Sequence, residues 1–211
     1  MIIHKESILN KLPSEKLNEK EIILFESIVH LVTTLNISYD RLKSMLLKNA
    51  DDLAEELLMI DVWHIIDTSH RLRCILEKTP GIKKNEPWFQ LTLRKLQKTE
   101  DIRNFIQHYN REIDSLLTNV KPLLGHLSWY EDINDKEFKV VTIIPGNIRK
   151  FQGLGVVNPA GRLIRDKIDL ITFYIGNCKI SLSDIFYQLI EFIVGIEKHI
   201  EVKARTIHQA T

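Results

Sequence analysis

The chain has 211 residues, of which 44% are hydrophobic and 27% are charged, and its formal net charge is +1 at pH 7. This length and apolar content suit one ordinary domain with a buried core, while the scarcity of Gly and Pro excludes a disordered or fibrous chain. The near-neutral charge excludes a uniformly basic nucleic-acid-binding protein, and the two distant cysteines indicate neither a zinc site nor a disulfide framework.

The charge is nevertheless distributed unevenly along the chain. Residues 1–69 hold seven Lys and Arg against twelve Asp and Glu, whereas residues 70–111 hold ten against four. Residues 112–211 hold twelve of each. The basic middle segment suits an anionic ligand such as RNA, but a solvated helix face has the same composition and is an equally good interpretation.

Helical periodicity dominates the first half of the chain. The pattern predicts a first helix over residues 14–36, begun by Ser14, and a shorter helix over residues 39–48. A long helix is expected over residues 51–78, where acidic residues crowd the start and a Thr-Pro-Gly sequence ends the run. After a linker, a short helix is expected over residues 88–98.

The next helix is expected over residues 99–120, with Thr99 as its cap. Its apolar residues share one stripe of the helix. Arg103, Asn104 and His108 fall outside that stripe and face away from the core that their own helix forms. They are therefore free to meet a substrate or a second subunit.

After Pro122 the pattern changes from helix to strand. Residues 126–131, 137–145 and 168–176 are rich in β-branched and aromatic side chains and predict a small antiparallel sheet. The last two strands are joined by a basic, glycine-containing loop, for which a flexible hairpin tip is a better interpretation than a phosphate-binding loop. A final amphipathic helix is expected to begin near Ser181.

These elements predict a mainly α domain over residues 1–211. Residues 123–180 form a β-rich insert before the last helix, which makes the class α+β. The N-terminus has no long apolar leader, and no run reaches the roughly 18 apolar residues that span a bilayer. We therefore expect a soluble, cytoplasmic chain without a membrane partner.

The chemistry of the basic segment centres on Arg103, Asn104 and His108. Metal-independent RNA cleavage needs a base for the ribose 2′-hydroxyl, an acid for the leaving oxygen and a cation for the phosphate. His serves as base or acid near neutral pH, and Arg presents a planar fork that matches phosphate. One helix therefore supplies two of these three functions, with Asn104 as an orienting amide, and the same His of a second subunit supplies the third.

The Arg-Asn-x-x-x-His pattern resembles the motif of the HEPN superfamily, whose helical bundles include many metal-independent ribonucleases. This resemblance implies a helical bundle, a homodimer with two facing motifs, and Arg103, Asn104 and His108 as the catalytic residues. It covers the helical parts of the chain best over residues 51–79 and 99–120. It also implies contexts such as stress response, phage defence or a toxin controlled by a protein antitoxin. Paired toxins of the family carry Tyr two residues after the His, whereas here Tyr109 follows directly, so control through that Tyr is not expected.

The basic residues around the motif are candidate RNA ligands, although they equally suit a solvated surface. They are Arg71, Arg73, Arg94, Lys95, Lys98 and Arg111. No cofactor and no metal site is expected, because the histidines lack ligand spacing. The alternative function is a non-catalytic homodimeric helical domain that binds another protein.

Overall fold

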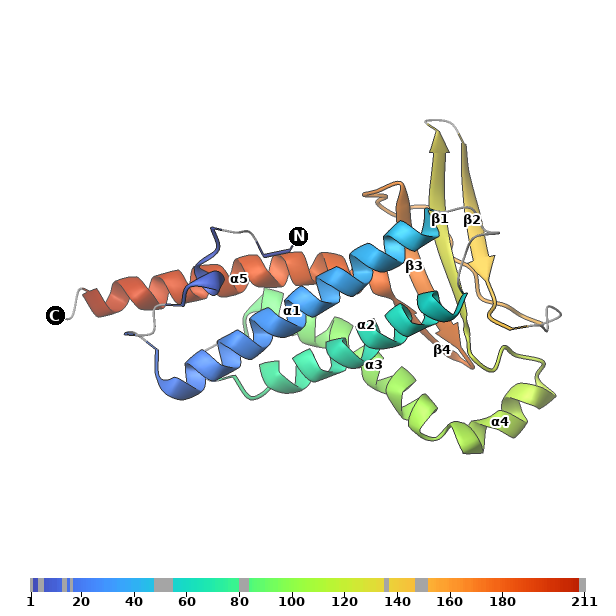
Figure 1. Ribbon diagram of the computed structural model, residues 1–211, viewed down its shortest axis with the longest axis horizontal. Coiled ribbons are helices and arrows are strands. Elements are labelled where there is room, and N and C mark those ends of the chain that lie inside the picture. Colours follow the sequence, from blue (N-terminus) through green and yellow to red (C-terminus); the bar gives the residue numbers. More distant parts are fainter. Residues whose placement is uncertain are drawn as a thin grey trace.

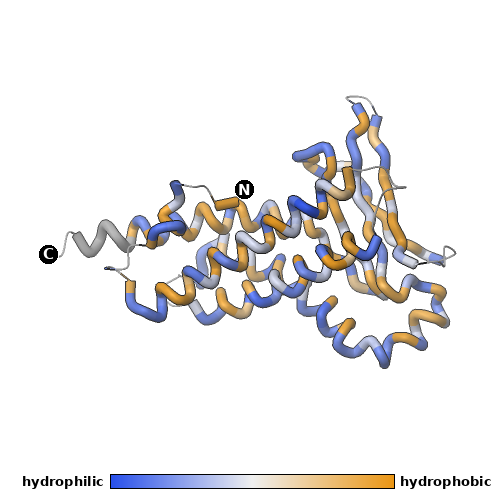
Figure 2. Tube along the Cα trace, in the orientation of Figure 1, coloured by the Kyte–Doolittle hydropathy of each residue, from blue (hydrophilic) through white to orange (hydrophobic). Residues whose placement is uncertain are grey.

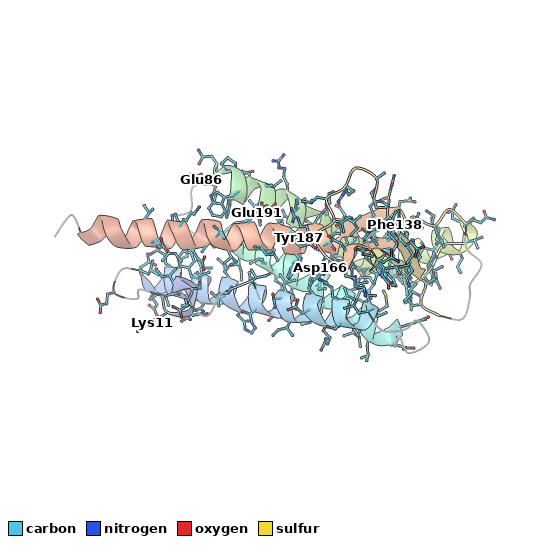
Figure 3. The ribbon with its side chains drawn as sticks, turned by 90° about the horizontal axis from the view of Figure 1, so that it is seen from above. Lys11, Glu86, Phe138, Asp166, Tyr187 and Glu191 are labelled. Atoms are coloured by element: carbon cyan, nitrogen blue, oxygen red, sulfur yellow. The ribbon has the colours of Figure 1, made fainter. Side chains whose placement is uncertain are left out.

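The computed structural model shows an elongated molecule with a helical bundle at one end and a sheet at the other (Figure 1). Phe138 lies at the sheet end, and Lys11 and Glu86 lie toward the other end of the bundle (Figure 3). Across the described part of the chain there are five α-helices and a four-stranded antiparallel sheet that precedes the last helix. This confirms the predicted fold class. The structure describes residues 2–3, 6–12, 15, 17–47, 55–79, 84–134, 137–146 and 152–208.

Helix α1 (Glu19–Leu46) replaces the two helices expected over residues 14–36 and 39–48. It begins with a capping box in which the Asn18 side chain accepts from the Glu21 amide at 2.9 Å, whereas the expected cap, Ser14, lies outside the described residues. The expected break around Asn36 and Ser38 is wrong, because tertiary partners satisfy both side chains. Asn36 accepts from the Ile2 amide at 3.0 Å, and Ser38 bonds the His64 ring at 3.0 Å.

Helix α1 is also long and apolar enough to cross a membrane by length and composition alone. This departs from the expectation that no segment reaches that length. Ten of its residues, including Phe25, Ile28 and Val32, are buried inside the molecule. The core helix of a water-soluble protein passes the same test, so the property is weak support for a membrane span.

The bundle core forms where α1, α2 (Glu55–Leu76), α3 (Pro87–Gln107) and α5 (Leu182–His208) pack together. Each helix carries hydrophobic and hydrophilic residues in alternation, as Figure 2 shows. The last helix was expected to be amphipathic, and its apolar residues, such as Leu189, Phe192 and Ile196, are buried. Burial of such side chains removes apolar surface from water and is the main stabilising term for this fold.

The expected helix boundary at Thr99 is wrong, and the helix breaks at His108 instead. Thr99 is buried inside α3, where its hydroxyl donates to the Leu96 carbonyl oxygen. His108 leaves helical geometry (φ −105°, ψ 21°), and α4 (Tyr109–Thr118) then turns away from the bundle (Figure 1). Because the Tyr109 hydroxyl donates to the Leu123 carbonyl oxygen at 2.9 Å, α4 is held toward the start of the sheet.

The sheet has the strand order β2-β1-β3-β4. Its strands are β1 (His126–Asn134), β2 (Glu137–Ile143), β3 (Ile168–Ile175) and β4 (Cys178–Ser181), the last of which the sequence did not indicate. One face buries Trp129, Ile171 and Phe173 against the helices, whereas Tyr174 and Lys179 pair across β3 and β4 on the other face. The sheet thus has one face on the core and one outer face.

The described part of the loop between β2 and β3 lies on this outer face rather than forming a free hairpin tip. The Val157 amide donates to the Ser128 hydroxyl at 3.2 Å, and the His126 ring bonds the Gly155 carbonyl oxygen at 2.7 Å. Gly155 is required here, because a Cβ would lie 2.4 Å from the Tyr174 ring. We call residues 152–165 the roof segment.

Candidate functional site

A groove of about 770 Å³ runs between α1 and α2, with one residue of α3 at its edge. We call it the α1–α2 groove. Its lining residues are Ile23, Glu26, Ser27, His30 and Leu31 of α1, His70, Arg71, Cys74 and Ile75 of α2, and Arg103 of α3. Arg71 and Arg103, two of the residues singled out from the sequence, therefore meet at one place.

Asp67 holds these two guanidinium groups together. Its Oδ2 atom lies 2.7 Å from the Arg71 Nε atom, and its Oδ1 atom lies 3.3 Å from the Arg103 Nε atom. In both ion pairs Nε is the closest atom to the carboxylate, and the terminal nitrogens of Arg71 and Arg103 make no hydrogen bond within the described residues. Two planar N–H arrays of this kind match the oxygens of a phosphate.

The groove does not carry a strong net field. Asp67 and Glu26 balance Arg71 and Arg103 while the histidines are neutral. A phosphate must therefore be recognised by directed, charge-assisted hydrogen bonds rather than by long-range attraction. A histidine in its imidazolium form adds a further positive charge.

Two histidines line the groove beside the arginines. His30 lies exposed on α1, and His70 lies half-buried on α2, one helical turn before Cys74. The His70 Nε2 atom lies 3.6 Å from the Cys74 sulfur, and its Nδ1 atom is buried without a hydrogen-bond partner in the described structure. The groove thus combines imidazoles with guanidiniums, which are the groups that acid–base chemistry on a phosphodiester needs.

Asn104 and His108 lie apart from this groove lining. Both side chains are exposed, and the His108 amide donates to the Asn104 carbonyl oxygen at 3.0 Å as α3 ends. Arg103 turns toward α2, with 38% of its side chain exposed. Within one chain the motif is therefore divided, with Arg103 in the groove and Asn104 and His108 on the outer surface of the α3–α4 junction.

The candidate RNA ligands are dispersed as well. Arg73 binds Glu77 at 2.9 Å and also Glu100, and only 16% of its side chain is exposed. The hydrogen bonds from Arg73 and Gln97 hold the Glu100 pKa below its ordinary value. Exposed Arg94 and half-buried Lys95 lie along α3, exposed Arg111 lies on α4, and Lys98 lines a different cavity beside the sheet. Only Arg71 of this set lines the groove.

Sequence reasoning missed His30 and His70 as companions of the arginines. His30 is more than 70 residues from Arg103 in the chain, and only the packing of α1 on α2 places both on one groove. That His70 and Arg103 line one groove can be recognised only once the packing of α2 against α3 is known. Among the described residues, no three His, Cys, Asp or Glu side chains lie close enough together to hold a metal ion.

Comparison of the chain with family models, with curated proteins and with solved structures finds no match. The resemblance to the HEPN superfamily thus rests on the motif residues alone.

Proposed function

We propose that the protein binds RNA at the α1–α2 groove and cleaves it without a metal ion. The observation that carries this proposal is the bridge formed by Asp67, which joins Arg71 and Arg103 at a groove lined by two histidines. The resemblance of the Arg103 motif to that of HEPN ribonucleases supports the same chemistry.

In this proposal the terminal nitrogens of Arg71 and Arg103 bind the non-bridging oxygens of one phosphate. One imidazole, of His30 or His70, takes the proton from the ribose 2′-hydroxyl, and the oxygen attacks the phosphorus atom. The other imidazole gives a proton to the departing 5′-oxygen as that bond breaks. The guanidiniums offset the negative charge that develops on the phosphate.

The motif histidine, His108, enters a second form of the proposal. A homodimer that opposes two α3–α4 junctions would place His108 of one chain beside Arg103 of the other, with Asn104 as an orienting amide. The two forms differ in which imidazole does the acid–base work. They share Arg103 as the phosphate ligand.

The test is cleavage of mixed cellular RNA in EDTA, followed on gels. We expect His30→Ala, His70→Ala and Arg103→Ala to slow cleavage by about a hundredfold, the usual scale for loss of an acid, a base or a charge-stabilising group. Lys198→Ala, an exposed cation of α5 outside the groove, is the control and should cleave like the parent.

The remaining variant, His108→Ala, separates the two forms. If it cleaves at the parental rate, the acid–base groups lie in the groove of one chain. If it is inactive while His30→Ala and His70→Ala are active, the composite dimer site is correct. Absence of cleavage by the parent on every RNA tested would contradict the enzymatic proposal altogether.

A second candidate function is a homodimeric interaction domain, and α4 favours it. Of the residues of this helix only Leu116 is buried, while Leu117 is 59% exposed. Val120 and Leu124, which follow this helix in the chain, are 41% and 53% exposed. Several exposed apolar side chains in one short segment are typical of a protein contact. A second copy, or a regulator such as an antitoxin, is the proposed partner.

A further inference from the structure

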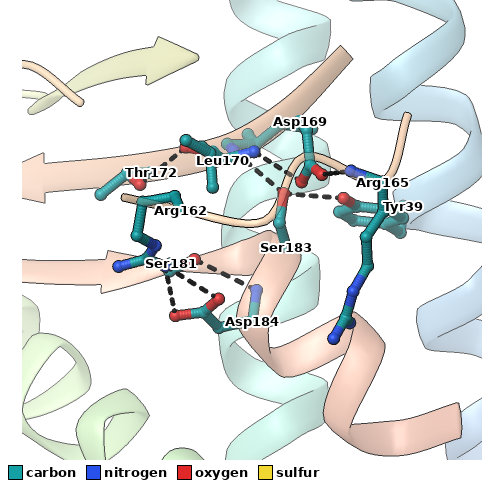
Figure 4. A network of polar contacts seen from close by, with 10 residues as sticks. Tyr39, Arg162, Arg165, Asp169, Leu170, Thr172, Ser181, Ser183 and Asp184 are labelled. Carbon is teal, nitrogen blue, oxygen red and sulfur yellow. Dashed lines mark hydrogen bonds and ion pairs between the residues drawn. The ribbon is translucent and has the colours of Figure 1, made fainter. Parts of the chain in front are cut away.

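A separate polar cavity of about 350 Å³ lies between the roof segment and the outer face of the sheet. Thr172 and Tyr174 of β3 and Lys179 of β4 form its floor, and Lys98 of α3 closes one side. Arg162 of the roof segment also lines the cavity, and its side chain extends toward Asp184 (Figure 4). The cavity shares no lining residue with the α1–α2 groove.

Several bonds anchor the roof segment and the chain that follows it, so the cavity has defined walls. The Val157 amide and the Gly155 carbonyl oxygen bond side chains of β1, as described above. The Arg165 amide donates to the buried Asp169 carboxylate at 2.7 Å (Figure 4). Asp166 binds Lys43 of α1, and this bond holds the pKa of Asp166 below its ordinary value.

The cavity offers more hydrogen-bond donors than acceptors. Within the described structure, the ammonium groups of Lys98 and Lys179 and the hydroxyl of Tyr174 have no acceptor. The carboxylate among the lining residues belongs to Asp184, and Arg162 approaches both of its oxygens at 3.2 Å. The charges of Arg162 and Asp184 thus cancel, and the two lysines give the lining residues a net charge of +2.

The lining hydroxyls of β3 and β4 differ in what they leave for a ligand. The Thr172 hydroxyl donates its proton to the Leu170 carbonyl oxygen at 2.8 Å, whereas the Ser181 hydroxyl accepts from the Asp184 amide at 3.1 Å and has no acceptor for its own proton among the described residues (Figure 4). Donors still outnumber acceptors, so the cavity suits a ligand that brings acceptors and negative charge. Charge-assisted bonds from lysines to oxyanions satisfy that requirement.

The Tyr174 ring limits what else the ligand can do. One face stacks on His126, with ring centroids 4.8 Å apart, and Gly155 is packed against the same ring so closely that a Cβ would clash. The face that stacks on His126 is therefore closed to a ligand, and the Tyr174 hydroxyl is the polar group that the ring offers. Burial raises the pKa of Tyr174, which keeps that hydroxyl protonated as a donor.

We propose that this cavity binds a phosphate group, held by Lys98 and Lys179 with the Tyr174 hydroxyl as a third donor. Its volume admits a phosphorylated small molecule as well as free phosphate. The proposal is independent of RNA cleavage in the α1–α2 groove, because the two sites share no lining residue.

The test is isothermal titration of the full chain with inorganic phosphate, pyrophosphate and adenosine 5′-monophosphate. We expect saturable binding of at least one of them by the parent and about tenfold weaker binding by Lys98→Ala and by Lys179→Ala, since each removes one charge-assisted bond. Both lysines are exposed, so neither variant endangers the fold. Arg94→Ala is the matched control for loss of a cation on α3.

The arms also identify the source of the phosphate. Adenosine, which lacks the phosphate, is the control ligand. Tighter binding of adenosine 5′-monophosphate than of inorganic phosphate, with no binding of adenosine, indicates a phosphate ester. Equal binding of adenosine 5′-monophosphate and inorganic phosphate indicates the free anion. Absence of saturation for all three phosphate-containing probes up to about 10 mM overturns the proposal, because a built site with two lysines should bind more tightly than that. So does unchanged binding by the double lysine variant.

Discussion

At the scale of single residues, Asp67 holds both arginines of the proposed phosphate site. Its two carboxylate oxygens each bind one Nε atom, and the two ion pairs orient Arg71 and Arg103. Asp67 is 37% exposed, so these pairs add little to stability. Their effect is positional, because they keep the terminal nitrogens of both arginines available.

Asp67→Asn is therefore expected to separate RNA cleavage from RNA binding. Misplacement of a phosphate ligand by about 1 Å can cost about a hundredfold in rate, so cleavage should fall by at least tenfold. Binding should be equal or tighter, since the variant removes a negative charge next to the RNA. The rates come from single-turnover gels and the affinities from filter binding.

A suitable control is Glu77→Gln, which removes a carboxylate from Arg73 outside the groove. An unchanged cleavage rate for Asp67→Asn, or weaker RNA binding by it, would be evidence against the positional role of Asp67.

His126 makes stability depend on pH. Burial lowers its pKa below the ordinary value of 6.5, against the opposing effect of the Gly155 carbonyl oxygen. Its Nε2 donates to that oxygen, and its Nδ1 is buried without a partner in the described structure. The unfolded chain therefore binds a proton more readily than the folded chain. Neutral His126 therefore contributes fully to the free energy of unfolding above pH 6.5, and this contribution is lost as the pH falls below 6.5.

His126→Gln should accordingly show a flatter dependence of unfolding free energy on pH between about 7.5 and about 5.5. The amide of Gln retains a donor for Gly155 but has no titrating group. Urea unfolding at several pH values measures the difference. An equal slope for His126→Gln and the parent would refute the assignment.

At the scale of elements, the packing of α3 on α5 depends on a glycine. A Cβ on Gly195 would lie 2.7 Å from the Cδ2 atom of Trp88 and 2.8 Å from its Cε3 atom. Trp88 is held in turn by Phe89 and Phe192, whose ring centroids lie 5.7 and 5.8 Å away. The indole therefore has little freedom to withdraw.

Two effects oppose each other in Gly195→Ala. Ala is about 1 kcal/mol better than Gly inside a helix, whereas overpacking costs about 1–3 kcal/mol. The clash involves rigid ring atoms, so we expect net destabilisation of about 1 kcal/mol in urea unfolding. In a Trp88→Leu background the clash is relieved, and the same change should stabilise by about 0.5 kcal/mol. Stabilisation in the parental background would contradict this view of the α3–α5 contact.

Local sequence signals predicted the elements whose ends they control. Ser181 precedes α5 and accepts from the Asp184 amide, as its position in the sequence suggested. Strands β1, β2 and β3 follow the β-branched runs, because such residues pack well on a half-buried sheet. These predictions needed no knowledge of distant contacts.

Other elements depend on distant contacts and were not predictable. Helix α1 continues through Asn36 and Ser38 because Ile2 and His64 satisfy their polar groups. Strand β4 is only four residues long and exists through its pairing with β3. In the candidate site, local sequence indicated Arg103 and the basic segment, but the pairing of Arg103 with Asp67 and the nearness of His30 arise from helix packing.

At the scale of the whole molecule, α4 is the element least integrated with the rest. It projects from the bundle below the sheet (Figure 1), and its exposed apolar residues are not covered in a single chain. His108 lies nine residues before Leu117, about 13 Å along a helix. A two-fold contact through α4 would therefore bring two motif histidines to the edges of one interface, which joins the dimeric form of the proposed function to this surface.

Self-association through α4 predicts that the parent sediments as a dimer and that Leu117→Asp sediments as a monomer. A buried aspartate without a partner is strongly unfavourable, so the variant should weaken dimerisation by at least about a hundredfold. Leu163→Asp is the matched control, because Leu163 is 72% exposed on the roof segment, away from α4. A monomeric parent at every concentration, or a dimeric Leu117→Asp, would rule out this interface. A monomeric parent that still cleaves RNA would assign the acid–base groups to the groove of one chain.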